Sequence, residues 1–342
     1  MRRTSLALGI LALTFTGACR RFESGRPPGE VVVYSSTDKE FSELIFEAYR
    51  KKTGVRVLAV YDTEETKTAG LTARLVAEAT HPKGDVFWSS DTSRAVALLE
   101  RNVVTPYESP AAAGIPARYK DPQHRWTGFG ARIRVILYNT DRVKPGGAPA
   151  SILDFAKPEW KGRFAIPNPH FGTMSFHAAA LFLTWGDGRA TEFFRALKEN
   201  GAVLCAGNAD VTGRVSDAKV DAGIVDEDDA IVALREKKPV ALVVPDQGPD
   251  GLGTPVMPNT AMLIAGAPHP EEARRFLDFL VSAEAEQILA ASAASQIPLH
   301  PGVNGPAGIP PLEKIRVLDV DYSAVARKLA TMDAALKEVL GI

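Results

Sequence analysis

The sequence has little of what builds a covalent or metal-stabilised scaffold. It contains two cysteines in 342 residues and no Cys-x-x-Cys pair, so neither a disulfide framework nor a cysteine-based zinc site can form. Its six histidines are scattered, and no two have the spacing of metal ligands. The 40 basic and 41 acidic side chains leave a formal net charge of −1, which gives no electrostatic case for binding nucleic acid or an anionic membrane surface.

The signatures of common catalytic sites are also missing. No His-Glu-x-x-His, Gly-x-Ser-x-Gly or Gly-x-x-x-x-Gly-Lys-Ser/Thr motif occurs, and no Gly-x-Gly-x-x-Gly follows a predicted strand. Because the chain also begins like an exported protein, this absence favours a protein that is not an enzyme.

What is present is a long chain of ordinary globular composition. Its length exceeds that of a usual single domain and predicts two lobes. Apolar residues make up 45% and charged residues 24%, which is enough apolar surface for a core and argues against a largely disordered chain.

Residues 1–19 are typical of an export signal, with two early arginines and an apolar run at Leu6–Phe15. That run is shorter than the roughly 20 residues needed to span a bilayer. Thr16–Cys19 resembles a bacterial lipobox, which predicts acylation of Cys19, a tether over residues 20–29 and a periplasmic protein that meets the membrane only through its lipid. Plain secretion stays open, because Thr16 stands where leucine is usual. Cys205 lies in an apolar run and is expected to be buried and inert.

An alternation of strands and helices follows the tether. Apolar runs at Val31–Tyr34, Val55–Tyr61 and Asp85–Trp88 predict strands, each followed by a helical pattern. Thr37 and Glu40 have the spacing of a capping box and predict a helix start. This order indicates an α/β lobe with a mainly parallel sheet. Later strands are predicted at Ile133–Tyr138, Phe164–Ile166, Ala202–Leu204, Ala222–Val225, Val240–Val244 and Ala261–Ile264.

Five polar loops follow strands or open helices, at 35–38, 62–68, 89–91, 170–175 and 226–229. Ligands of open α/β sheets bind at the carboxyl ends of strands, against helix N-termini. Helix capping alone explains any one loop, but a shared cleft explains all five better. The ligand-binding residues predicted from these loops are Ser36, Thr37, Asp38, Thr66, Ser89, Ser90, Gly172, Thr173, Ser175, Asp226, Asp228 and Asp229.

Two loops carry most of the information about the ligand. Residues 171–175 precede an apolar helix and could direct amides and two hydroxyls at one anion. Residues 226–229 are four consecutive acids, which repel one another, so a bound cation, amine or polyhydroxy ligand would relieve that repulsion. Helix capping is the alternative for both loops.

Four stretches, in this order, resemble the periplasmic solute-binding proteins of ABC importers, in the cluster grouped around ferric-iron binders. They are Val31–Glu40, Asp85–Ser90, Pro158–Pro169 and Ala273–Ser282. The resemblance implies a two-lobed type 2 periplasmic-binding clamp, in which each lobe is an α/β unit with a mixed, mainly parallel sheet and two crossings form the hinge.

On that fold, residues 30–134 plus 259–315 form lobe 1, residues 135–258 form lobe 2, and residues 316–342 form a helical segment that packs on the lobes. The resemblance further implies a monomeric receptor without a resident cofactor, which delivers its solute to an ABC permease and the associated ATPase. Sensing for a membrane receptor would use the same clamp.

The sequence departs from the ferric-iron binders at three positions. Those proteins carry adjacent tyrosines where Asp228 and Asp229 stand, and many have a histidine at the position of Asp38. Ferric iron with a synergistic anion, held by Asp228 and Asp229, is one expected ligand, although carboxylates also suit Mg²⁺ and Ca²⁺. A phosphorylated sugar or an aminophosphonate is the alternative, with the acids accepting hydrogen bonds and residues 172–175 holding the phosphate. A secreted enzyme that uses Asp228 or Asp229 as a general base is the rival of another class.

Overall fold

The structure, a computed structural model, describes residues 29–62, 69–144 and 146–341. The predicted export signal, Cys19 and Thr66 lie outside these residues. In the described part of the chain, no helix has the length and apolar character needed to cross a membrane.

The first strands and helices alternate as the sequence predicts. Strand β1 (Glu30–Ser35) pairs in parallel with β2 (Arg56–Tyr61) and with β3 (Val86–Ser89), and helices α1 (Lys39–Thr53) and α2 (Ala69–Ala77) connect them. Helix α1 ends at Gly54, whose φ of 77° is the left-handed conformation that glycine adopts without strain. The predicted capping box is wrong: Asp38 occupies the N-cap position and its side chain makes no capping bond.

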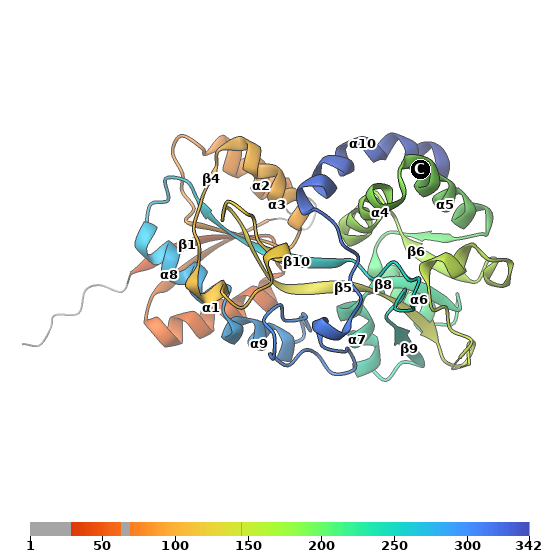
Figure 1. The fold of residues 1–342 in the computed structure, drawn as a ribbon. Helices are drawn as coiled ribbons and strands as arrows, with labels where there is room; N and C mark the ends of the chain where they lie inside the picture. Colours follow the sequence, from red (N-terminus) through yellow and green to blue (C-terminus); the bar gives the residue numbers. More distant parts are fainter. Residues whose placement is uncertain (1–28, 63–68, 145, 342) are drawn as a thin grey trace, which may run out of the picture.

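One long strand joins two parts of the sheet. In β5 (Thr127–Asn139), residues 127–133 pair antiparallel with β10 (Val256–Ile264), whereas residues 134–139 pair antiparallel with β8 (Ala222–Asp226) and β9 (Val240–Val243). We call β1–β4, β10 and residues 127–133 the first half of the sheet, and residues 134–139 with β6–β9 the second half. Figure 1 shows β5 and β10 crossing the middle of the molecule.

The remaining elements cover these two halves. Strand β4 (Val104–Thr105) pairs with β10, and β6 (Phe164–Pro167) pairs in parallel with β7 (Val203–Cys205) and β8. The path through the sheet is β2-β1-β3-β10-β5-β8-β6-β7. The other α-helices are α3 (Thr92–Val96), α4 (Gly172–Trp185), α5 (Asp187–Glu199), α6 (Asn208–Ser216), α7 (Glu227–Arg235), α8 (Pro270–Leu280), α9 (Ala283–Ala291) and α10 (Tyr322–Leu340). Short 3₁₀ turns lie at 97–101, 110–112, 117–119, 152–156, 158–160 and 312–314.

Helix α10 contacts both halves of the molecule. It packs on α3 beside the first half and on α4 and α5 beside the second, as Figure 1 shows for α4 and α5. At its start, the Tyr322 ring lies 5.6 Å from that of Trp126 and 5.7 Å from that of Phe176, and its hydroxyl donates to the Val256 carbonyl. The C-terminal helix therefore lies across the junction between the halves.

Aromatic side chains fill the core of the first half. Trp88 and Phe129 are fully buried, with ring centroids 5.4 Å apart.

Cys205, in the second half, is 2% exposed, which confirms that it is buried, and burial raises the pKa of its thiol to about 11.

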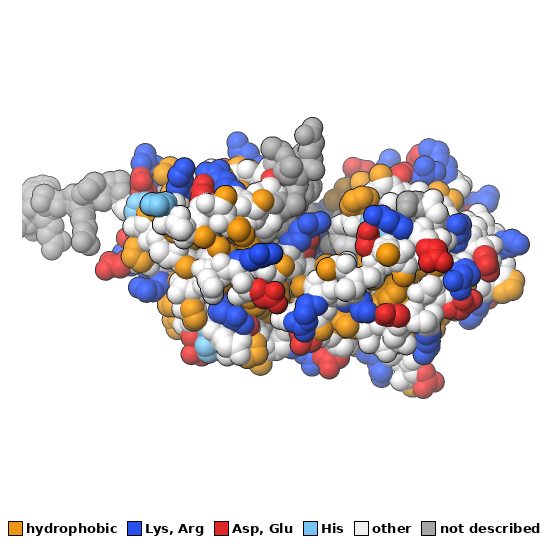
Figure 2. Space-filling view, turned by 90° about the horizontal axis from the view of Figure 1, so that it is seen from above, with side chains coloured by type: hydrophobic (Ala, Val, Ile, Leu, Met, Phe, Trp, Pro, Cys, Tyr) orange, Lys and Arg blue, Asp and Glu red, His pale blue; other side chains and the backbone are white. Residues whose placement is uncertain are grey.

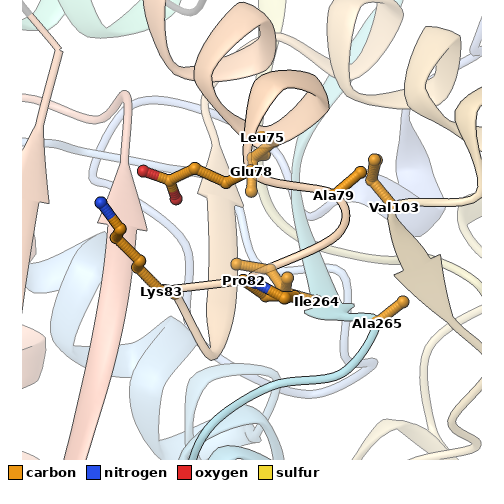
Figure 3. A pocket seen from close by; sticks show the side chains of 9 residues that line it. Leu75, Glu78, Ala79, Pro82, Lys83, Val103, Ile264 and Ala265 are labelled. Atoms are coloured by element: carbon orange, nitrogen blue, oxygen red, sulfur yellow. The ribbon is translucent and has the colours of Figure 1, made fainter.

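Packing is equally close near the far end of β10. A Cβ on Gly84 would lie 2.7 Å from Cδ1 of Ile264, so a larger residue here would require the Ile264 side chain to shift. Figure 3 shows the neighbouring nook, where Pro82 and Ile264 lie between Leu75 and Ala265. The nook is too small to hold a water molecule, so it is no candidate ligand site.

Candidate functional site

A cleft of about 810 Å³ lies between the two halves. It is bordered by the carboxyl ends of β1, β3, β6, β7 and β8 and by the first residues of the helices that follow them, which is where open α/β sheets bind ligands. Its lining residues come from both halves: Ser36, Thr37, Asp38, Phe41, Ser90, Asp91, Thr92, Arg94, Arg132, Phe171, Gly172, Thr173, Phe176, Ala206, Asn208, Asp228, Met257, Ala294 and Gln296. Figure 2, seen from above, shows acidic and basic side chains interspersed over the outer surface.

Seven of the predicted binding residues line this cleft: Ser36, Thr37, Asp38, Ser90, Gly172, Thr173 and Asp228. Ser89, Ser175, Asp226 and Asp229 do not. Ser89 is fully buried and its hydroxyl donates to the Asp91 carbonyl, while the Ser175 hydroxyl donates to the Gly172 carbonyl. The binding roles of all these residues stay predictions.

In the first half of the cleft, neutral hydroxyls bond to the neighbouring loop. The Ser36 hydroxyl accepts a hydrogen bond from the Ser90 amide at 3.0 Å, and the Ser90 hydroxyl donates to the Ser36 carbonyl at 3.1 Å. These bonds fix the loop after β1 against the loop after β3. Thr37 is 6% exposed, and its hydroxyl has no hydrogen-bond partner in the structure. A buried hydroxyl without a partner is costly to the fold.

Two arginines that the sequence analysis did not select lie at the cleft: Arg132 lines it, and Arg134 lies buried beneath it. Arg132 and Arg134 are two apart on β5, so their side chains share one face of the strand. A guanidinium nitrogen of Arg132 donates to the Ser90 carbonyl at 2.7 Å, and another lies 3.7 Å from a carboxylate oxygen of Asp226. Arg132 thus links the two halves. Two charges at this spacing in an apolar strand are the sequence signal that could have identified them.

Arg134 and Asp226 form a fully buried ion pair under the second half of the cleft. Nη1 of Arg134 lies 2.6 Å from Oδ1 of Asp226, and both side chains are 0% exposed. Thr173 donates to Oδ2 of Asp226 at 2.7 Å, and the Asn208 amide donates to the same oxygen at 2.9 Å. Asp226 therefore lies beneath the cleft wall, where it is hydrogen-bonded on both oxygens. The charge of Arg134 and, above all, burial lower the pKa of nearby His177 to about 3.

The acids after β8 are crowded at the start of α7. Ligand atoms of Asp226, Asp228 and Asp229 all lie within 4.8 Å of one another. Burial, followed by the charge of Asp226, raises the pKa of Asp228, and burial with the charges of Asp228 and Asp226 raises that of Asp229. Glu227 is fully buried and accepts from the Ile133 amide; burial and the charge of Asp228 raise its pKa well above the usual range.

Among the described residues, Asp226, Asp228 and Asp229 form the group of acids that could hold a metal ion. Both oxygens of Asp226 accept hydrogen bonds from side chains, whereas Asp228 accepts one on Oδ1, from the Asp229 amide. Asp228 and Asp229 therefore have more capacity left for a metal ion than Asp226. A cation between them would favour their ionised forms and relieve their repulsion. An ammonium group or a ligand hydroxyl would act in the same direction more weakly.

Comparison with known proteins adds a family and two relatives. The family model for bacterial extracellular solute-binding proteins matches residues 82–324. The chain is 24% identical over 336 residues to the major ferric iron-binding protein of Neisseria meningitidis serogroup B, covering 95% of this chain and 96% of the relative. It is 23% identical over 265 residues to a putative 2-aminoethylphosphonate-binding periplasmic protein of Salmonella typhi, covering 75% of each.

Among solved structures, the fold is similar to that of a Trichodesmium protein, IdiA or FutA, in complex with iron and citrate. The TM-score is 0.80 at 25% sequence identity, and the similarity covers 92% of this chain and 99% of that one.

Proposed function

This chain belongs to the family of bacterial extracellular solute-binding proteins, and we propose that it captures ferric iron in the cleft between its two halves and delivers it to an ABC permease. Its type 2 periplasmic-binding fold, expected from the sequence, is confirmed by the structural relatives. Members of this family bind solutes, and relatives matched over 84–95% of this chain are named for iron binding or iron uptake.

The observation that carries the iron proposal is the group of three acids at the start of α7. Carboxylates are hard oxygen donors and suit a hard, highly charged cation. Asp228 and Asp229 would ligate the ion directly, and Asp38, which lines the first half of the cleft, would add a third carboxylate when the halves close. A synergistic anion would occupy the remaining coordination positions beside Arg132.

The way the chain works as a receptor follows from its topology. We propose that residues 30–134 with 259–315 and residues 135–258 form the two lobes, that residues 316–342 pack across them, and that iron drives closure because it binds the closed state more tightly. The receptor acts as a monomer, an ATPase powers the permease, and lipidated Cys19 anchors the protein in the periplasm. The solute leaves chemically unchanged.

Iron binding is tested by loading purified protein with ferric nitrilotriacetate and measuring bound iron and affinity. We expect one iron per chain, and a loss of at least tenfold in affinity in the double variant Asp228→Asn plus Asp229→Asn. The matched control is Asp217→Asn plus Glu199→Gln, which removes two exposed acids elsewhere in the second half. Equal iron affinity in the site variant and the control would contradict the proposal.

A specific observation supports a second candidate ligand. All seven tyrosines lie in the described residues, and none lines the cleft, whereas phenolates are the ligands that select Fe³⁺ in the iron binders that this sequence resembles. Carboxylates at Asp228 and Asp229 would also accept hydrogen bonds from the amine of an aminophosphonate. Thermal unfolding with 2-aminoethylphosphonate and with glucose 6-phosphate tests this candidate. A shift with either, together with no iron binding, would replace the iron proposal.

A further inference from the structure

The buried pair of Arg134 and Asp226 is built into the sheet. The two residues lie opposite each other in the register of the antiparallel strands β5 and β8. Both side chains are 0% exposed, with 2.6 Å between Nη1 and Oδ1. A buried ion pair seldom adds net stability compared with an apolar pair of similar size. Stability alone therefore gives no reason for charges at these two positions.

The pair is bonded to two residues that line the cleft. Thr173, in the first turn of α4, donates its hydroxyl proton to Asp226 and accepts from Arg134 at 3.0 Å. Asn208, in the first turn of α6, accepts from Arg134 at 2.9 Å through its carbonyl oxygen and donates to Asp226 at 2.9 Å. The orientation of both side chains is therefore fixed from beneath the cleft.

These bonds determine what the second half of the cleft can offer a ligand. The hydroxyl protons of Thr173 and Ser175 are both directed at acceptors within the protein. A phosphate at this turn would therefore depend on backbone amides of α4. Asp228 and Asp229 lie close by, and a bound cation, which favours their ionised forms, leaves their oxygens as acceptors only. The second half thus presents acceptors and negative charge.

We propose that Asp226 and Arg134 are positioning residues, which hold Thr173 and Asn208 in place and make the second half of the cleft select a positively charged ligand group. This inference rests on the proposed function, because it concerns the same site. Asp226 balances Arg134, so the charges of Asp228 and Asp229 act on the ligand without an uncompensated cation beneath them.

The test uses one substitution that should lower the affinity for a cation and raise the affinity for an anion. In Asp226→Asn, the acceptor atom is kept but Arg134 loses its counter-ion. We expect ferric iron, supplied as nitrilotriacetate, to bind about 10- to 100-fold more weakly, and inorganic phosphate, titrated without metal, to bind more tightly than to wild type. Distortion of the site would weaken both, and that result would overturn the proposal.

A second variant guards against misfolding of the first. Arg134→Met plus Asp226→Leu removes both charges, and apolar replacement of a buried pair is often neutral or stabilising. We expect this protein to unfold at a denaturant concentration near that of wild type while iron affinity falls by about tenfold. Wild-type affinity here would show that the pair positions nothing. The matched control is Asp221→Asn, which removes a buried, arginine-paired acid next to the opposite end of β8; it should lower stability and leave affinity unchanged.

Failure of this inference is distinguishable from failure of the iron proposal. If Asp228→Asn plus Asp229→Asn abolishes iron binding while both Asp226 variants keep it, the function stands and the positioning role falls. If wild type binds no iron, ethanolamine replaces it as the cationic probe. Weaker ethanolamine binding and tighter phosphate binding in Asp226→Asn then support the positioning role, and any other pattern overturns it.

Discussion

The side chains at and beneath the cleft are held by neutral hydrogen bonds in the first half and by a buried ion pair in the second. In the first half, Ser36 and Ser90 are neutral and bond to each other's loop at 3.0–3.1 Å. In the second half, the groups below the surface are ionised and fully buried. Neutral hydrogen bonds contribute about 0.5–1.5 kcal/mol each, whereas a buried charge without a partner is several times more costly. The second half should therefore dominate the response of this protein to mutation.

Breaking the buried ion pair tests that contrast most severely. Arg134→Met leaves Asp226 buried beside Thr173 and Asn208 without its cation, and we expect the free energy of unfolding to fall by about 3–5 kcal/mol. Urea unfolding followed by circular dichroism measures the change. A loss below 1 kcal/mol would show that water or a rearranged Arg132 compensates the acid, and the two halves would then be energetically alike.

The same contrast separates the features that could be predicted from the sequence from those that could not. The order of strands and helices followed from apolar periodicity. Four of the five polar loops contribute residues to the cleft, because α/β topology brings the carboxyl ends of strands together, while nearly all of the fifth, 62–68, lies outside the described residues. Which way each of the four acids at 226–229 points could not be predicted. Four consecutive acids look alike in a sequence, and only the antiparallel register of β5 with β8 shows that Asp226 faces Arg134.

The wrong prediction of a capping box and the failure to select the arginines have related reasons. Thr37 and Glu40 have the correct spacing, but helix α1 begins one residue later, after Asp38, because the chain leaves β1 through a loop bonded to Ser90. Arg134 lies within the predicted strand Ile133–Tyr138 and Arg132 directly precedes it, so neither stood out as a candidate binding residue. In both cases a tertiary contact between distant segments decided the local outcome.

A buried pair also lies behind the first half, and pH separates its contribution. Nδ1 of His300 lies 2.8 Å from Glu286, and Nε2 lies 2.9 Å from the Ala111 carbonyl, so both nitrogens face oxygen acceptors. Bonding to Glu286 raises the pKa of His300, in spite of burial and the charge of Lys120. The stabilisation is complete below the unfolded-state pKa of about 6.5 and is lost as pH rises through the higher folded-state value.

We therefore expect His300→Gln to lose about 2 kcal/mol at pH 6, as for a hydrogen bond to a charged group, and less at alkaline pH. Urea unfolding at several pH values measures this. The wild-type protein is its own control, since its stability should decline towards alkaline pH and approach that of the variant. A difference between the two proteins that is constant with pH would mean that His300 is neutral in the folded state.

Thr37 offers a change of the opposite sign in the first half. Its hydroxyl is buried without a partner, so Thr37→Val removes an unsatisfied group while keeping the shape of the side chain. We expect the ligand-free protein to gain about 1 kcal/mol in stability. The control is Thr53→Val at the other end of α1, where the hydroxyl donates to the Tyr49 carbonyl and its loss should destabilise by a similar amount. Destabilisation by both variants would mean that Thr37 is satisfied in solution.

The smallest expected effect comes from an ion pair that differs from the Arg134 pair mainly in exposure. Arg94 lies 3.3 Å from Asp91 at the start of α3, but its side chain is 48% exposed. Solvent screens such a pair, so Arg94→Met should change the free energy of unfolding by no more than about 0.5 kcal/mol. The substitution leaves the α3 cap intact, because Asp91 accepts that bond from the Arg94 backbone amide. Comparing Arg94→Met with Arg134→Met in one urea series therefore sets an exposed pair against a buried, hydrogen-bonded one. If the two losses were equal, neither burial of charge nor the hydrogen bonds of Arg134 to Thr173 and Asn208 would distinguish the halves energetically.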